Sequence, residues 1–383
     1  MKRINLYFDF TFPSPSINLP PKIKSSLTPL EGVKVNKTLN FFKPLHVRNP
    51  DSISAEKLSE NAISLSHWLE MGFPSMLVPE YSAEIGKQVM SGLLWMLPEM
   101  TLDDPVVQVT AKTLALAGIY DDILDTGGKF IVEEFRPVKE KMIKSVLALL
   151  RLGLEMDLYA AESIRVEPFI QKFCILIIKN FMDLGLTNPG DLAPRIISQI
   201  STVASNMMTC EWISKNQVHH SPRRYSMDVA RRFRVQDDAF SMFAEHFYNV
   251  RYGLLPSWIL ASPQFQMFKN IACHISSGLN DVLGFKKDII KGEADGMIML
   301  RIAWGESPLL VLEDELRILQ EYIEDYMNLR DELCTNFPEA DNYVEMVDSY
   351  IYGYFQGMNN STRYLLDGVI HLGDNPSDCV VTN

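Results

Sequence analysis

Three carboxylates follow an apolar, helix-forming run in the first third of the chain. The run Ala115–Tyr120 leads into Asp121, Asp122 and Asp125, which have the spacing DDxxD. On a helix, Asp121 and Asp125 lie one turn apart on the same face, whereas Asp122 points about 100° away and could serve hydrogen bonding instead. A cation between the first two would relieve their repulsion, and oxygen ligands favour Mg²⁺ or Mn²⁺ over zinc. Acidic groups near a helix end are common, so this motif alone also fits a solvated surface.

A second group of polar residues lies about 155 residues downstream. Asn280, Gly284 and Asp288 follow the spacing i, i+4, i+8 and therefore share one stripe of a helix. An amide oxygen and a carboxylate two turns apart, with a glycine between them, leave room for a metal ion and its water. Lys287 flanks the stripe and could donate to a phosphate oxygen. The alternative is a charged, solvated helix face, but a glycine inside a helix costs about 1 kcal/mol relative to alanine.

Basic residues form two further candidates. Five arginines gather before Asp237 and Asp238: Arg223, Arg224, Arg231, Arg232 and Arg234. The pair Arg363–Tyr364 follows near the end of the last long helical segment. Each group by itself also fits a solvated or amphipathic helix face, and it is their joint presence and order that favours a site for an anionic ligand.

These residues must be positioned mainly by helices. Residues 1–60 are rich in proline and poor in helical periodicity, and they predict an arm that wraps over the main body or is partly mobile. From residue 61 the chain predicts one all-α domain of about ten helices, with no glycine-rich strand-to-helix turn of a nucleotide-binding fold. The expected helices cover residues 55–70, 82–98, 104–125, 136–157, 167–183, 192–215, 226–248, 264–290, 308–335 and 339–366.

Composition excludes several classes of protein. The chain has 383 residues, 47% of them hydrophobic, and a net charge of −12 that argues against nucleic-acid binding. Its five cysteines are scattered without a CxxC pair, so neither a disulfide framework nor a zinc site is expected. No apolar run is long enough for a signal peptide or a membrane span. We therefore expect a cytoplasmic protein without stable membrane insertion, as a monomer or homodimer.

The four groups in this order resemble the microbial, single-domain class I terpene synthases (terpene cyclases). That family has an aspartate-rich motif, a second metal motif of the form N-D-x-x-S/T/G-x-x-x-E/D, a diphosphate-sensing arginine and a late R-Y pair. Arg234 lies 46 residues before Asn280 and three before Asp237, which matches the family's sensor and linker. Gly284 replaces the commoner serine or threonine, and Asp288 replaces the longer glutamate. Because Ala230 stands where a tyrosine often precedes the sensor, Arg231 remains a rival for that role.

The resemblance implies a helical bundle around a central active-site cavity and a Mg²⁺-dependent reaction. Three Mg²⁺ ions, for which Mn²⁺ could substitute, would be held by Asp121, Asp122, Asp125, Asn280, Gly284 (through water) and Asp288. Arg231 or Arg234, with Lys287, Arg363 and Tyr364, would bind the diphosphate of farnesyl or geranylgeranyl diphosphate. Ionisation and cyclisation would give a sesquiterpene or diterpene and pyrophosphate.

Three alternatives remain from the sequence. An isoprenyl diphosphate synthase should carry two DDxxD motifs, whereas the second site here is the stripe of Asn280, Gly284 and Asp288. A non-catalytic helical interaction protein would use its acidic motifs as solvated faces. A Mg²⁺-dependent phosphohydrolase lacks a clear general base, because His219–His220 lies in a polar stretch without an aspartate partner.

Overall fold

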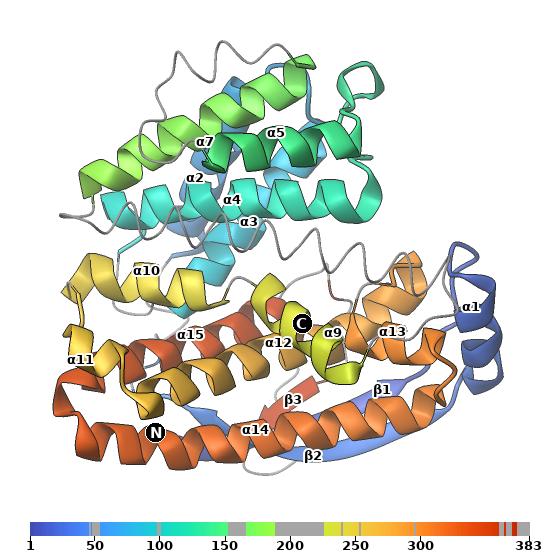
Figure 1. Ribbon diagram of the computed structural model, residues 1–383. Coiled ribbons are helices and arrows are strands. Elements are labelled where there is room, and N and C mark those ends of the chain that lie inside the picture. Colours follow the sequence, from blue (N-terminus) through green and yellow to red (C-terminus); the bar gives the residue numbers. More distant parts are fainter. Residues whose placement is uncertain are drawn as a thin grey trace. The chain divides into compact units, whose positions relative to one another are not determined.

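The computed structural model describes residues 1–45, 47, 54–97, 101–151, 166–187, 226–238, 240–252, 254–294, 296–359, 364 and 370–373. It is predominantly helical, which confirms the predicted fold class (Figure 1). Contacts group the chain into two compact units. One contains residues 1–47, 209–241 and 255–383, and the other contains residues 48–208 and 242–254.

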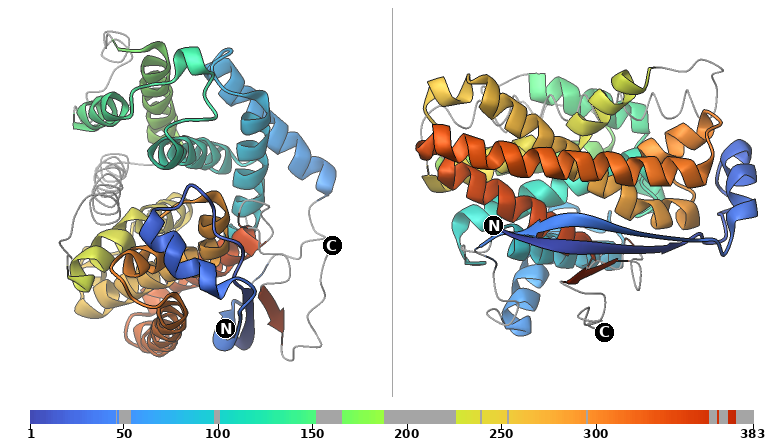
Figure 2. Two further views of the ribbon diagram at one scale, coloured as in Figure 1. Left: turned by 90° about the vertical axis from the view of Figure 1, so that its right-hand side faces the viewer. Right: turned by 90° about the horizontal axis from the view of Figure 1, so that it is seen from below.

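The first unit includes a three-stranded antiparallel sheet that the sequence reading missed. Strand β1 (Lys2–Thr11) lies between β2 (Lys34–Lys43) and β3 (Ile370–Gly373). The short helix α1 (Pro21–Leu27) stands between β1 and β2 in the sequence. The sheet therefore joins segments from opposite ends of the chain (Figures 1 and 2).

Residues 2–11 form a strand because apolar side chains alternate along them. The buried members of this alternation are Ile4, Leu6, Phe8 and Phe10. Phe10 stacks on Phe285 of α12 with ring centres 5.4 Å apart. On the second strand, Phe42 stacks on Tyr326 of α14 at 5.3 Å. The hairpin thus packs on the helices of the same unit, and the proline content of residues 1–60 hid this period-2 pattern.

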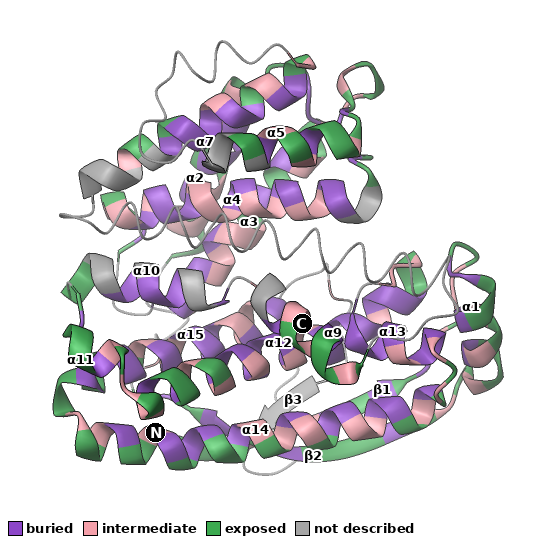
Figure 3. Cartoon of the chain, in the orientation of Figure 1, coloured by how far each residue is buried: buried purple, intermediate pink, exposed green. Residues whose placement is uncertain are grey.

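The remaining helices of the first unit are α9 (Met227–Asp237), α11 (Ser257–Leu260), α12 (Pro263–Lys291), α13 (Met297–Ala303), α14 (Pro308–Asn336) and α15 (Asp341–Asn359). Helix α12 begins where the Ser262 hydroxyl accepts from the backbone N–H of Phe265. It ends at Gly292, whose φ of 83° is a left-handed conformation that favours glycine. The long helices α12 and α14 pack against each other, and α14 also contacts β2 (Figure 1). Figure 3 shows that buried and exposed positions alternate along α14.

The second unit consists of α2 (Ala55–Gly72), α3 (Pro79–Met96), α4 (Pro105–Thr126), α5 (Lys139–Arg151), α7 (Pro168–Thr187) and most of α10 (Phe240–Tyr252). Helix α4 begins at the N-cap Asp104, whose carboxylate accepts from the backbone N–H of Val106 at 2.8 Å. It packs on α3 and α7. Short 3₁₀ turns cover Thr28–Leu30, Glu133–Phe135 and Pro338–Ala340.

Two predicted helices are corrected. The helix expected over 226–248 is two helices, because α9 ends at Asp237 and α10 begins at Phe240. The helix expected to reach residue 366 ends at Asn359, and Tyr364 lies in a turn. Several predicted features lie outside the described residues. They are the helix over 192–215, residues 152–157 at the end of the helix expected over 136–157, and the residues Arg223, Arg224, His219–His220 and Arg363.

Candidate active site

The stripe predicted on α12 forms a small cradle of oxygen atoms. A Cβ atom added at Gly284 would lie 3.7 Å from Asn280 Oδ1 and 3.8 Å and 3.9 Å from the two carboxylate oxygens of Asp288. The absence of a side chain at Gly284 therefore leaves a space bordered by three oxygen atoms. This donor set has the chemistry of a Mg²⁺ site.

Asp288 is buried in a way that disfavours its charge. Its side chain is 12% exposed, and burial raises the pKa of the carboxyl group to about 6, with Lys287 acting in the opposite direction. Lys287 Nζ lies 3.3 Å from Asp288 Oδ1 and 2.7 Å from Glu293 Oε2. One ammonium group is thus shared by two carboxylates, and a divalent cation beside Asp288 would further stabilise the ionised form.

Asn280 belongs to a polar cluster that the sequence reading did not identify. Its amide nitrogen donates to the Tyr354 hydroxyl at 2.8 Å and to Asp238 Oδ1 at 3.4 Å. The Tyr354 hydroxyl in turn donates to Asp238 Oδ1 at 3.2 Å, and the Ser276 hydroxyl donates to Asp238 Oδ2. Burial, followed by the charge of Asp238, raises the pKa of Tyr354 well above its usual range, so this hydroxyl keeps its proton.

Arg234 lies against the residue that follows Asn280. Its Nε donates to Asp281 Oδ1 at 2.9 Å, and a second guanidinium nitrogen lies 2.8 Å from the same oxygen. The other oxygen of Asp281 accepts from the backbone N–H of Met297 at 3.1 Å. A Cβ at Gly296 would lie 3.0 Å from Asp281 Oδ1, so a side chain there would push on the carboxylate that Arg234 holds. Asp281 thereby ties α9 and the start of α13 to α12.

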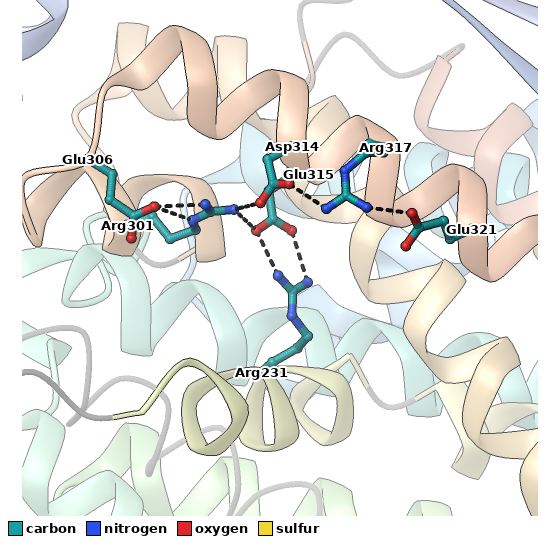
Figure 4. A network of polar contacts seen from close by, with 7 residues as sticks. All are labelled: Arg231, Arg301, Glu306, Asp314, Glu315, Arg317 and Glu321. Carbon is teal, nitrogen blue, oxygen red and sulfur yellow. Dashed lines mark hydrogen bonds and ion pairs between the residues drawn. The ribbon is translucent and has the colours of Figure 1, made fainter.

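Arg231, the rival of Arg234, is engaged elsewhere. Its guanidinium forms a bidentate pair with Glu315 of α14, at 2.9 Å and 2.7 Å (Figure 4). Glu315 is 5% exposed and also accepts from Arg301 at 2.8 Å. Figure 4 shows that Asp314 and further residues extend this network along α14. The geometry of Arg231 is that of a buried structural ion pair.

Of the predicted C-terminal pair, Tyr364 is close to the α12 residues. Lys287 Nζ lies 5.8 Å from the centre of the Tyr364 ring, within the range of a cation–π interaction. Within the first unit, the structure therefore brings Asn280, Gly284, Lys287 and Asp288 together with Tyr364. Asp237 is the last residue of α9, and its side chain lies outside the described part of the chain.

The aspartate-rich motif occupies the last turns of α4 in the second unit. Asp121 and Asp122 are half-buried, and the side chain of Asp125 lies outside the described part of the chain. The Tyr81 hydroxyl donates to Asp122 Oδ2 at 2.6 Å, so the Asp122 carboxylate accepts a hydrogen bond from α3. The Tyr81 ring is held by stacking on Phe130 at 3.8 Å.

Cations compensate the negative end of α4, where carboxylates are electrostatically disfavoured. Lys139 donates to the carbonyl of Leu124, and Arg136 Nε donates to the carbonyl of Gly128 at 3.2 Å. Lys139 thus satisfies a carbonyl of the last turn of α4, and Arg136 satisfies a carbonyl just beyond its end.

In the described ranges, no three His, Cys, Asp or Glu side chains converge as a metal-binding group. A cation in the α12 cradle therefore depends on the amide oxygen of Asn280 as well as on a carboxylate. None of the helices described is both long and apolar enough to cross a membrane.

A scan against protein-family models gives no match for this sequence. A search of curated proteins gives none either. Solved structures, in contrast, match over most of the chain. The 2-methylisoborneol synthase from Streptomyces coelicolor A3(2), solved with Mg²⁺ and geranyl-S-thiolodiphosphate, is similar with a TM-score of 0.64 and 11% identity, over 85% of this chain and 96% of that one.

Two further synthases show the same similarity. The linalool/nerolidol synthase from Streptomyces clavuligerus gives a TM-score of 0.61 at 15% identity, over 82% of this chain and 98% of that one. A structure of a-eudesmol synthase gives 0.59 at 16% identity, over 84% and 97%. At such identities the similarity establishes the fold, and it confirms the resemblance predicted from the motifs. The chain has the all-α fold of the class I terpene synthases.

Proposed function

We propose that this chain is a Mg²⁺-dependent class I terpene cyclase that ionises a linear prenyl diphosphate and cyclises the resulting carbocation. The observation that carries the proposal is the cradle on α12, where oxygen atoms of Asn280 and Asp288 border the space over Gly284. The similarity of the fold supports it, because 2-methylisoborneol synthase was solved with Mg²⁺ and diphosphate analogues.

In this proposal, Mg²⁺ ions are held by Asn280 and Asp288 with water over Gly284, and by Asp121 with Asp125 and Asp122 in support. The bound metal supplies positive charge that stabilises the departing pyrophosphate. Three ions are the number we propose, with Mn²⁺ as a substitute. The space over Gly284 supports a water molecule as metal ligand, in place of the hydroxyl that a serine at position 284 would supply.

The basic residues have separate roles. We assign diphosphate sensing to Arg234 with Asp237 as its linker, because Arg234 pairs with Asp281, the residue next to Asn280, whereas Arg231 is bound bidentately by Glu315 of α14. Lys287, Tyr364 and Arg363 complete the diphosphate-binding set by donating charge-assisted hydrogen bonds and a phenolic hydrogen bond. Arg231 then acts by holding α9 on α14.

Cleavage of the C–O bond leaves an allylic carbocation on the hydrocarbon chain. The side chains around it must exclude water until ring closure, because water would capture the cation as an alcohol. Aromatic faces stabilise such cations. Farnesyl and geranylgeranyl diphosphate, which lead to sesquiterpenes and diterpenes, are the proposed substrates. We further propose that residues 61–383 form the cyclase domain and that residues 1–60 are its arm, in a cytoplasmic monomer or homodimer.

The proposal is tested by incubating the purified protein with Mg²⁺ and C10, C15, C20 or C25 prenyl diphosphate. Gas chromatography–mass spectrometry should detect a cyclic hydrocarbon or alcohol from at least one of the four, and removal of Mg²⁺ with EDTA should stop its formation. Absence of any such product from all four substrates would refute the cyclase function. A longer prenyl diphosphate formed on addition of isopentenyl diphosphate would instead indicate a chain-elongating prenyltransferase.

A variant separates catalysis from folding. Asp121→Ala should abolish product formation while the far-ultraviolet circular dichroism stays that of the wild type, since the side chain is half-buried near the end of α4. The matched control is Asp325→Ala on the exposed face of α14, which should retain wild-type product yield. Unchanged yield in Asp121→Ala would remove this residue from the metal ligands.

A further inference from the structure

An asparagine can present either an oxygen or a nitrogen to a cation, and only the oxygen can bind it. In this structure Asn280 Oδ1 faces the space over Gly284, 3.7 Å from the position that a Cβ there would take. The opposite side of the amide, Nδ2, faces Tyr354 and Asp238. These contacts of Nδ2 hold the amide in this orientation.

The two protons of the Asn280 amide both have acceptors. One is directed to the Tyr354 hydroxyl oxygen at 2.8 Å and the other to Asp238 Oδ1 at 3.4 Å. Rotation of the amide by 180° would place its oxygen against the Asp238 carboxylate, so that two acceptors face each other. The rotated form also loses donation to Tyr354 and leaves buried groups unsatisfied, which is costly.

The acceptors are themselves held in place. Tyr354 donates its own proton to Asp238 Oδ1 at 3.2 Å, so its oxygen lone pairs remain directed at Asn280. The second oxygen of Asp238 accepts from Ser276, which is 1% exposed and lies one turn before Asn280 on α12. Asp238 directly follows α9, and this helix is bound to α12 by the ion pair of Arg234 with Asp281.

We propose that Tyr354, Asp238 and Ser276 act as positioning residues that fix the Asn280 amide with its oxygen toward the cation. This inference rests on the proposed function, because it assumes that a divalent cation and a diphosphate bind beside α12. It assigns roles to Tyr354 and Ser276, which lie outside the predicted motifs, and to Asp238, which follows the arginine cluster. Hydrogen-bonded partners behind a metal ligand typically change metal affinity by about 10- to 100-fold when they are removed.

The test measures cation binding without turnover. Thermal unfolding is followed at increasing Mg²⁺ with a fixed concentration of inorganic pyrophosphate, because a ligand that binds only the folded state raises the unfolding temperature. Tyr354→Phe keeps the ring and removes the hydroxyl, and it should raise the Mg²⁺ concentration needed for a given increase in the unfolding temperature by about 10-fold or more. Ser276→Ala should shift it in the same direction.

Tyr352→Phe is the matched control on the same helix. Tyr352 is 6% exposed and its hydroxyl accepts from Gln356 at 2.9 Å, so the same substitution also removes one hydrogen bond. Its Mg²⁺ requirement should equal that of the wild type. Comparison of the two variants without Mg²⁺ separates a loss of stability from a loss of cation affinity.

A double-variant cycle tests orientation directly. An aspartate at position 280 has oxygen on both branches, so no orientation needs to be fixed. In the Asn280→Asp background, Tyr354→Phe should therefore change the Mg²⁺ requirement much less than it does in the wild-type background. An equal change in both backgrounds would overturn the orienting role.

The outcomes distinguish this inference from the proposed function. If the wild type is not stabilised by Mg²⁺ with pyrophosphate, the proposed function fails and the inference fails with it. If the wild type is stabilised and Tyr354→Phe has the same Mg²⁺ requirement, only the inference is overturned. A large shift in Tyr354→Phe, none in Tyr352→Phe and its suppression by Asn280→Asp would support it.

Discussion

Replacing Asp288 with asparagine should make the metal-free protein more stable at pH 7. Burial raises the pKa of this carboxyl group from 3.8 to about 6 in the folded protein. A shift of about two units corresponds to about 3 kcal/mol, because each unit is worth 1.36 kcal/mol. At pH 7 the wild type carries this cost, whereas asparagine resembles the protonated form and carries no charge.

The pH dependence has a defined sign. Between about pH 4 and pH 6 the folded protein retains a proton that the unfolded chain has released, so the free energy of unfolding decreases as the pH rises through this window. The difference between wild type and Asp288→Asn should therefore be small below pH 4. It should grow to about 3 kcal/mol in favour of the variant near pH 6 and stay constant above it.

The measurement is urea unfolding of both proteins in EDTA at several pH values. Asp325→Asn, on an exposed part of α14, is the control and should stay within about 0.5 kcal/mol of the wild type at pH 7. Equal stability of wild type and Asp288→Asn at pH 7, or a difference that does not depend on pH, would refute the reasoning. The same variant should lose its stabilisation by Mg²⁺ with pyrophosphate.

Three further outcomes are expected. Gly284→Ser should bind Mg²⁺ more tightly in the pyrophosphate titration, because a Cβ fits there in ordinary contact and the hydroxyl adds an oxygen ligand; weaker binding would contradict the cradle. Glu315→Gln should lower the free energy of unfolding by about 3–5 kcal/mol in urea, since Arg231 would lose its buried partner charge, and a loss below 1 kcal/mol would argue against a buried pair. Gly86→Ala should lower the unfolding temperature, because its Cβ would lie 2.5 Å from the carbonyl oxygen of Ala62. Helices α2 and α3 must then move apart, at a cost of about 1–3 kcal/mol. An unchanged unfolding temperature would contradict this close contact between the two helices.

The long helices were predictable because their ends carry local signals. The expected helix over 264–290 corresponds to α12, which a serine N-cap opens and Gly292 closes. In contrast, the sequence gives no signal for the end of α9, because neither glycine nor proline occurs at positions 237–240. The break coincides with Asp238, whose carboxylate binds side chains of α12 and α15 that are distant in the sequence.

The candidate site was predictable only where its residues share one helix. Asn280, Gly284 and Asp288 could be placed on one stripe from spacing alone, and the structure shows their oxygen atoms around one point. Tyr354 lies 74 residues after Asn280, and no periodicity links the two. The choice between Arg231 and Arg234 likewise required the position of Glu315, which is 84 residues from Arg231 and meets it only in the folded chain.

The sheet formed by β2, β1 and β3 has a consequence for how this chain folds. The pairing of Phe8 with Ile370 and of Asn5 with Gly373 joins residues separated by almost the whole sequence. Contacts of such range form slowly, because a very long loop must close first. During synthesis, one edge of β1 therefore has no partner until residue 373 has left the ribosome, and an unpaired edge with buried-type side chains such as Leu6 favours pairing with other chains. Yield of the native protein should accordingly rise when the concentration of nascent chains is lowered, because the unpaired edge of β1 then meets fewer other chains.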